Sequence, residues 1–357
     1  MFFIGIDLHK RQSQICILDE QGQVHYEARV PTSRPDLADV LRSYLPARVV
    51  IEACPPSEWV ARHLESLGFE VVVADPGFAP MYATRDKKIK TDKRDARMLA
   101  NACKLGAFKP AHRLSDAQRE VRTFVQVRQT LVQTRTRLTN QISGVLLAQG
   151  FVMATGAPEN FTKRLERLDL PDALNAVMEP LCSLLGPLNE RIEQLDKELA
   201  SRAAHDAQAV RLQTIDGIGP LTSLLFVAVL DGAHRFEHAH QVMSYLGLVP
   251  REKSSGDKQM RGSITKAGHP QMRVLLVQAA LRIQRLQKPQ TARLHEWAEN
   301  IKERRGKRIA TVALARRLCG VMWAMLRDGT EYQAEPPRRT AGVGQGSGDN
   351  PRRALAA

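Results

Sequence analysis

The sequence predicts an α/β domain at the N-terminal end, followed by a mainly helical remainder. Over residues 2–73, short apolar runs alternate with amphipathic stretches, as strands and helices do in α/β domains. Beyond residue 114 the apolar residues recur every seven positions, which is typical of long packed helices. With 357 residues, 43% of them hydrophobic, the chain can bury the cores of two or three domains.

Five strands are expected in the first domain. Apolar runs place them at residues 2–8, 13–19, 24–30, 49–51 and 71–73. Helices are expected at about residues 34–44 and 57–67. The first three strands should pair in antiparallel fashion and the later ones should run parallel, because helices separate only the later strands.

Two acidic residues stand where strands of this domain end. Asp7 closes the first strand and Glu52 closes the fourth. In open α/β sheets, the working groups gather at the carboxyl ends of the strands. We therefore expect both carboxylates at one edge of the sheet.

Two further carboxylates, Asp92 and Asp95, lie three residues apart in a basic stretch. On a helix, positions i and i+3 share a face, so both side chains would point to one region of space. Two anions on one face repel unless neighbouring cations or a hard divalent ion lie between them. The simpler interpretation is a solvated helix start, where the helix dipole favours acidic residues.

The net charge of +14 indicates a polyanionic partner, because basic proteins bind phosphates and release their counterions. Arginine-rich solubility and an anionic membrane surface are the competing explanations. We expect no stretch long enough to span a membrane and see no signal-peptide pattern. The five widely spaced cysteines suggest a reducing compartment, without a zinc site or a disulfide framework.

Two long helices are expected before residue 208, separated by residues 150–171. The first carries a seven-residue series at Phe124, Leu131, Leu138 and Val145, beside a seam with Val121 and Ile142 that Arg128 and Arg135 interrupt. The second carries two series, Leu181, Leu188 and Leu195, and Leu185, Ile192 and Leu199. An antiparallel hairpin, a dimerising coiled coil and a plain pair of core helices all fit this pattern. The arginine- and glutamine-rich outer face of the first helix suits nucleic acid or plain solvation.

The third region begins near Leu212. Residues 215–220 resemble the glycine turn of a helix-hairpin-helix, whose backbone N–H groups can meet a phosphate. Residues 245–258 read as a polar loop, in which Ser254 and Ser255 lie among cations. Such a serine suits phosphoryl transfer, although an ordinary Ser/Gly loop has the same composition. Helices at about 272–286, 293–303 and 309–326 and a disordered basic tail from about residue 333 complete the chain.

Four motifs in this order resemble the DEDD-type insertion-sequence transposases. They are GIDLHK at residues 5–10, IEA at 51–53, KTDKRDA at 90–96, and PREKSSG at 250–256 with ITKAG at 264–268. This family of bridge-RNA-guided serine recombinases also includes a pilin-gene DNA invertase. The resemblance covers roughly residues 3–326.

The resemblance implies a RuvC-like, RNase H-type first domain, with an acidic tetrad that holds Mg²⁺ or alternatively Mn²⁺. The tetrad residues are Asp7, Glu52, Asp92 and Asp95. It further implies a C-terminal transposase domain in which Ser255, or its neighbour Ser254, attacks the DNA backbone and forms a phosphoserine intermediate. Asp257 stands where the family loop often has a second glycine. The activating base is open among Lys253, Lys258, Lys266 and His269.

The resemblance also implies the partners: DNA of the element ends and target, a guide RNA, and further copies of the chain in a dimer or tetramer. It implies a prokaryotic cytoplasm, near the nucleoid, and no membrane. The candidate nucleic-acid contacts are Lys90, Lys93, Arg94, Arg251, Lys253, Lys258, Arg261 and Lys266. The expected domains are 1–112 (RuvC-like), 113–208 (helical coiled coil), 209–330 (transposase domain) and 331–357 (tail).

Three functions are consistent with these residues. The leading hypothesis is an RNA-guided, Mg²⁺-dependent recombinase that moves its own insertion element. A covalent intermediate conserves the phosphodiester energy, and the chain indeed carries no G-x-x-x-x-G-K-[ST] nucleotide loop. The alternative is a RuvC-like nuclease that hydrolyses DNA with two metals, and the third is a catalytically silent nucleic-acid-binding protein.

Overall fold

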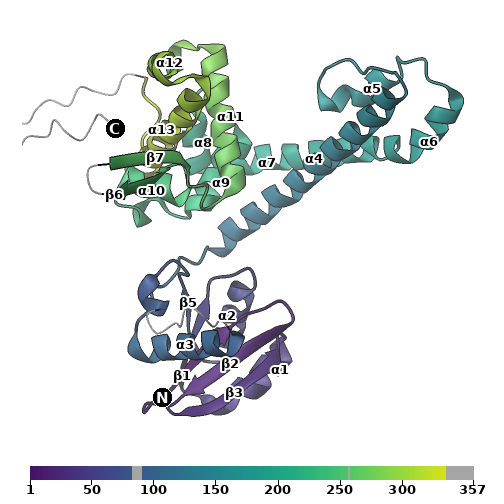
Figure 1. Cartoon of the computed structure of the whole chain (residues 1–357). Coiled ribbons are helices and arrows are strands. Elements are labelled where there is room, and N and C mark those ends of the chain that lie inside the picture. The colour runs from purple at the N-terminus through teal and green to yellow at the C-terminus, as the bar shows by residue number, and fades with distance from the viewer. Residues whose placement is uncertain (83–90, 256–257, 335–357) are drawn as a thin grey trace, which may run out of the picture. The chain divides into compact units, whose positions relative to one another are not determined.

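The computed structural model describes residues 1–82, 91–255 and 258–334, and the chain divides into two compact units, Met1–Leu114 and Ser115–Ala357 (Figure 1). The predicted basic tail lies largely outside the described residues, as do Lys90, Gly256 and Asp257.

The first unit is built on a five-stranded sheet in the order β3-β2-β1-β4-β5. Its strands are β1 (Phe2–Asp7), β2 (Gln12–Leu18), β3 (Val24–Pro31), β4 (Ala47–Glu52) and β5 (Glu70–Ala74). β2 pairs antiparallel with β1 and β3, whereas β4 runs parallel to β1 and β5. The predicted change from antiparallel to parallel pairing is therefore confirmed.

Helices cover both faces of this sheet. Successive residues of a strand point to opposite faces, so neighbouring residues of β4 pack against different helices. On β4, Val49 and Ile51 pack in the core that contains residues of α1 (Arg34–Leu41) and α2 (Ser57–Ser66). Val50, between them, packs instead with residues of α3 (Asp92–Leu105). The helix that carries Asp92 and Asp95 thus lies on the opposite face from α1 and α2.

The second unit begins with an antiparallel pair of helices, α4 (Asp116–Ala148) and α7 (Leu185–His205). The contacts between the two helices show that they run antiparallel: later residues of α4 contact earlier residues of α7. Along this direction, side chains of α4 contact α7 in the pairs Glu120–Arg202, Arg128–Asp196 and Arg135–Asn189. The hairpin is thus the arrangement adopted among those that the sequence left open. The tip, between α4 and α7, holds α5 (Phe161–Leu165) and α6 (Asp172–Cys182).

The predicted packing seam of α4 was wrong in two respects. The series from Phe124 to Val145 is only half buried, whereas the neighbouring seam that includes Val125, Ile142 and Leu146 is buried. Arg135 does not interrupt that seam but lies in it, 6% exposed, because Asn189 and Glu159 each contact its guanidinium at 3.0 Å.

On the returning side of the hairpin, one predicted series is confirmed and the other is not. Leu185, Ile192 and Leu199 are all buried on α7. Leu181 belongs to α6, which ends at Cys182, so it does not continue into the series of α7. The break between the two helices lies between Cys182, where α6 ends, and Leu185, where α7 begins.

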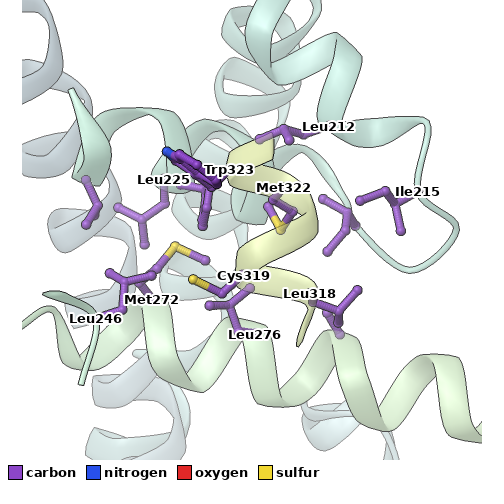
Figure 2. Close-up of a cluster of buried hydrophobic side chains, with 14 of the residues drawn as sticks. Leu212, Ile215, Leu225, Leu246, Met272, Leu276, Leu318, Cys319, Met322 and Trp323 are labelled. Carbon is purple, nitrogen blue, oxygen red and sulfur yellow. The ribbon is translucent and has the colours of Figure 1, made fainter. Parts of the chain in front are cut away.

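The rest of the second unit packs around α13 (Lys307–Asp328). The surrounding helices are α8 (Ala207–Gln213), α9 (Pro220–Leu230), α10 (Ala239–Tyr245), α11 (Pro270–Leu286) and α12 (Ala292–Arg305). Figure 2 shows Cys319 and Met322 of α13 facing side chains such as Leu276 of α11. The indole Nε1–H of Trp323 donates to the carbonyl oxygen of Ala233 at 3.0 Å, which satisfies its polar group inside the core.

Among the helices of the described residues, only α13 is long and apolar enough to cross a membrane. The expectation that no stretch reaches this length was therefore wrong. Most of the apolar window lies inside the helical core, as Figure 2 shows for its central turns. One buried helix of this kind is weak evidence for a membrane span.

His269 forms the N-cap of α11 and has an unusually low pKa. Its Nδ1 accepts a hydrogen bond from the backbone N–H of Met272 at 3.3 Å. Burial, together with the cations Arg122 and Arg273, lowers the pKa of His269 to about 4. The imidazole is therefore neutral near pH 7.

We expect this histidine to make the protein less stable as the pH falls from about 6.5 towards 4. The unfolded chain takes up the proton in this window, whereas the folded chain does not, so acid favours unfolding. Asparagine can still cap α11 but does not titrate here. His269→Asn should therefore flatten the pH dependence of the denaturant midpoint between these values. An equally steep dependence in the variant would show that other groups cause it.

Candidate active site

Two of the four predicted acidic residues end neighbouring strands at the same sheet edge. β1 and β4 run parallel with Ile6 opposite Ile51, and each strand ends one residue later, at Asp7 and Glu52. Both side chains are partly buried. The parallel register thus brings the two carboxylates together, as the sequence led us to expect.

The other two acidic residues lie in the first turn of α3. Thr91 is the N-cap, and its side chain accepts a hydrogen bond from the backbone N–H of Arg94 at 3.3 Å. Asp92 and Asp95 follow directly, where the helix dipole stabilises negative charge. The cap therefore fixes the point at which the helix presents its carboxylates.

A close backbone contact holds α3 against the sheet. A Cβ atom on Gly5 of β1 would lie 2.2 Å from both the carbonyl oxygen of Ala96 and the nitrogen of Ala100. Real Cβ atoms do not approach backbone this closely, so only glycine permits the contact. Gly5 lies two residues before Asp7, and its contact sets the distance between the β1 end and the helix that carries Asp92.

Replacing Gly5 by alanine should push α3 away from β1. We expect a loss of about 3 kcal/mol in unfolding free energy, at the upper end for overpacked cores because the clash is with backbone. Gly144→Ala on α4 is the matched control, since its Cβ would meet nothing within 4 Å and alanine favours a helix. Denaturant unfolding measures both variants, and equal stabilities would contradict the proposed contact.

The other three carboxylates are close enough to Asp7 to affect its pKa. Its pKa is raised, first by burial and then by the negative charges of Asp95, Asp92 and Glu52. His9 opposes this shift, with its Nε2 atom 3.3 Å from Oδ2 of Asp7 and 3.5 Å from Oδ1 of Asp92. The edge of the sheet therefore concentrates negative charge, which a cation would relieve.

Two residues of this site were missed in the sequence analysis. His9 follows Asp7 by two positions, so the alternation of an extended chain could have pointed to it. Arg29 of β3 contacts Asp92, with Nη2 and Oδ2 2.6 Å apart, and nothing local to either residue indicates this pair. Both side chains are therefore partners of Asp92.

The donor set fits a divalent metal. Asp7, His9 and Asp92 each offer one ligand atom, and these atoms lie within 4.8 Å of one another. Carboxylate oxygens are the ligands that Mg²⁺ prefers, whereas an imidazole nitrogen is better suited to transition metals.

The basic residues of α3 serve the fold as well. Lys93, a predicted nucleic-acid contact, lies 2.7 Å from Glu27 of β3, and Arg97 lies 2.9 Å from the same carboxylate. The Glu27 side chain is only 9% exposed. These two cations therefore neutralise a nearly buried acid and tie α3 to β3.

The predicted serine loop is instead a β-hairpin. β6 (Pro250–Ser255) and β7 (Lys258–Ile264) pair antiparallel, with Ser254 opposite Gln259 and Ser255 opposite Lys258. The hairpin was missed because residues 250–264 show no apolar alternation, and Arg251 and Met260 are both exposed. Ser255 therefore ends a strand, directly before the undescribed residues 256–257.

Two glycines fix the base of this hairpin. Gly247 and Gly268 both have positive φ, and a Cβ on Gly268 would lie 1.9 Å from the carbonyl oxygen of Tyr245. The guanidinium of Arg273 on α11 donates to the carbonyl oxygens of Leu246 and Ala267, one from each flanking segment. The hairpin thus rises from a rigid base on α11. Lys266 lies exposed in this base.

A carboxylate cluster at the edge of an α/β sheet, in a chain of net charge +14, is typical of enzymes that act on nucleic acids with a divalent metal. Residues 4–150 match the DEDD transposase model of IS110, and residues 209–296 match the model described as the transposase IS116/IS110/IS902 family.

Related proteins agree over almost the whole chain. The transposase for insertion sequence element IS1111A of Coxiella burnetii is 31% identical over 336 residues, which cover 92% of this chain and 91% of the relative. The transposase for insertion sequence element IS1328 of Yersinia enterocolitica is 32% identical, covering 92% and 98%. The chain therefore belongs to the IS110/IS116 family of DEDD transposases, enzymes that cleave DNA and transfer its strands. Membership implies use of a divalent metal and argues against a catalytically silent binder.

Proposed function

We propose that this transposase cleaves and rejoins DNA for a mobile insertion element, with Asp7, Glu52, Asp92 and Asp95 holding Mg²⁺ and Ser255 acting as nucleophile. The gathering of acidic groups around Asp7 carries the proposal: ligand atoms of Asp7, His9 and Asp92 lie within 4.8 Å of one another, and the pKa of Asp7 is raised first by burial and further by Asp95, Asp92 and Glu52. Such crowding of like charges is unfavourable without a cation, so the arrangement is best explained by metal binding.

The sheet supports a RuvC-like, RNase H-type first domain. Three antiparallel strands are followed by two parallel ones, and the acidic residues lie at the ends of β1 and β4 and on α3. The division at Leu114 agrees with a metal-binding domain that ends near residue 112. A further division near residue 208, between the helical hairpin and the transposase domain, is part of the proposal.

A bound Mg²⁺ would supply Lewis-acid stabilisation of the charge that builds on a phosphate during displacement. The carboxylates would hold it, and His9 and Arg29 would then exchange Asp92 for other partners. Mn²⁺ is a credible substitute, because carboxylate oxygens suit it as they suit Mg²⁺.

In the proposed reaction, the hydroxyl oxygen of Ser255 forms a bond to a backbone phosphorus. One bridging P–O bond breaks, and the leaving oxygen takes a proton. The phosphodiester energy is kept in the serine ester, so a DNA hydroxyl can reverse the step without ATP. The rigid base at Gly247, Gly268 and Arg273 supports this role, because a nucleophile must be held in position.

The remaining partners follow from the motif resemblance and from the charge of +14. We propose that the protein binds element-end and target DNA and an element-encoded guide RNA, in the bacterial cytoplasm. Target choice would then follow base pairing more than side-chain contacts. We propose a dimer or tetramer, in which the acids of one subunit serve the serine of another.

The alternative is a RuvC-like nuclease that hydrolyses DNA with water, since the acidic cluster alone would suffice for that reaction. Mass spectrometry of the protein after incubation with Mg²⁺, flanking RNA and both DNA partners separates the two. A DNA adduct on the tryptic peptide that carries Ser255 supports recombination. Cut DNA without any adduct supports hydrolysis.

A further inference from the structure

A basic surface lies where α11 and α12 end and α13 begins, three helices that pack against one another (Figure 1). We define it by six exposed cations: Arg285, Lys302, Arg304, Arg305, Lys307 and Arg308. Glu299 and Glu303 are the acidic residues in the same turns of α12. The segment from 302 to 308 lies beyond the matched range 209–296, so the family models do not account for it.

Three of these six cations have no side-chain partner among the described residues. Lys302 forms an ion pair with Glu299 at 2.5 Å, and Arg304 donates to a backbone carbonyl. Within the part of the chain that the structure describes, Arg285, Arg305 and Arg308 form neither an ion pair nor a hydrogen bond. Elsewhere, cations such as Lys93 and Arg128 pair with acids. The positive charge of these three arginines is therefore not offset by an ion pair within the described residues.

The start of α13 adds to this imbalance. The helix has no side-chain cap and no acidic residue in its first turn, and Lys307 and Arg308 are its first two residues. Cations at this end oppose the helix dipole, which favours anions there. Repulsion among the cations and repulsion by the dipole are both relieved by one class of ligand, a polyanion.

A shallow hollow of about 100 Å³ lies within the surface, lined by Leu281, Gln284, Arg285, Glu299, Lys302 and Lys307. It gives the cations a concave arrangement from three helices, into which a backbone phosphate can approach. Few apolar side chains accompany them: Ile309 and Leu286 are each half exposed. The surface therefore suits a phosphodiester backbone better than a lipid bilayer.

We propose that this basic surface binds the phosphate backbone of a nucleic acid, at a place separate from the acidic cluster of the first unit. The proposal rests on the proposed function only in that the partner is a nucleic acid. The chemistry recognised is the phosphodiester, which duplex DNA and folded RNA both present.

The test is the salt dependence of binding by the full-length Arg305→Gln/Arg308→Gln variant. Fluorescence anisotropy is measured with a DNA duplex and with an RNA hairpin of unrelated sequences, in EDTA so that the acidic cluster plays no part. For two lost duplex contacts, the slope of log K against log salt should become shallower by about 1.8, and affinity should fall on the order of tenfold or more near 0.1 M salt. The slope change is about 1.4 for a single-stranded partner.

Arg191→Gln/Lys197→Gln on α7 is the matched control, with the same loss of charge on exposed positions near acidic residues. Its slope should stay near that of the parent. A change with DNA alone assigns the surface to DNA, and a change with RNA alone assigns it to RNA. Unchanged slopes with both probes, or an equal change in the control, would overturn the proposal.

Thermal unfolding separates binding from a structural role. Because the replaced arginines repel their neighbours, the surface variant should melt at the same temperature as the parent or higher. A lower melting temperature together with weaker binding would indicate a structural role and overturn the proposal. None of these readouts depends on DNA cleavage, so failure of the proposed catalytic mechanism would leave them unaffected.

Discussion

Replacing Asp92 by asparagine is expected to reduce DNA cleavage by about a thousandfold, in the range seen when a group that stabilises developing charge is removed. Asparagine keeps the size of the side chain but loses its charge. Asp92 adds negative charge around Asp7 and contacts both His9 and Arg29. The variant therefore weakens the site without removing any buried apolar group.

Metal binding gives a second readout that does not depend on activity. For a metal that binds only the folded state, a concentration one hundred times the Kd adds about 2.7 kcal/mol of stability. Mg²⁺ and Mn²⁺ should thus raise the melting temperature of the parent and do so much less for Asp92→Asn. Loss of this charge should also lower the pKa of Asp7, because one like charge is gone.

The control for this prediction is Asp39→Asn on α1, an exposed acidic residue outside the cluster. It should cleave DNA and bind metal like the parent. If Asp92→Asn kept both activity and metal-dependent stabilisation, the acidic cluster would not be the metal centre, and the catalytic role proposed for it would be wrong.

Replacing Ser255 by alanine is expected to abolish the covalent DNA–protein adduct and to lower strand exchange on the order of 10⁴-fold or more, as losing a nucleophile does. Alanine removes the only oxygen of the side chain, and Ser255 ends β6, away from the base of the hairpin. The fold should therefore tolerate the change, which far-ultraviolet circular dichroism and the melting temperature can verify.

Ser254→Ala is the matched control for this variant. The proposal assigns the attacking hydroxyl to Ser255, so Ser254 is not expected to be needed for the adduct. Ser254→Ala should keep the adduct and most of the exchange. The opposite pattern would move the nucleophile to Ser254, and continued DNA cleavage by Ser255→Ala without any adduct would favour the hydrolytic nuclease.

Much of the first unit could be predicted from the sequence because its signals are local. The strand ends at Asp7 and Glu52 follow from apolar runs that stop at a charged residue. The start of α3 follows from Thr91, a capping residue before two acids. The five-strand pattern with a change of direction followed from where helices separate the strands.

The second unit shows where local signals mislead. Arg135 reads as a break in an apolar seam, yet it is buried because Asn189 of another helix and Glu159 supply its partners. The hairpin that carries Ser255 shows no apolar alternation in its sequence, and backbone pairing between its two strands forms it. A periodic pattern of apolar residues predicts which face of an element is buried. The prediction fails where polar contacts or backbone pairing decide the structure.

By itself the sequence determined the strands and helices of the first unit and carried the four acidic residues, the serine pair and the family resemblance, because capping, periodicity and motif spacing act within a few residues along the chain. Only the tertiary structure decided that His9 and Arg29 meet Asp92, that Gly5 sets the approach of α3, and that cations from three helices form one basic surface. These contacts join residues that are distant in sequence, and their distances depend on how the completed elements pack.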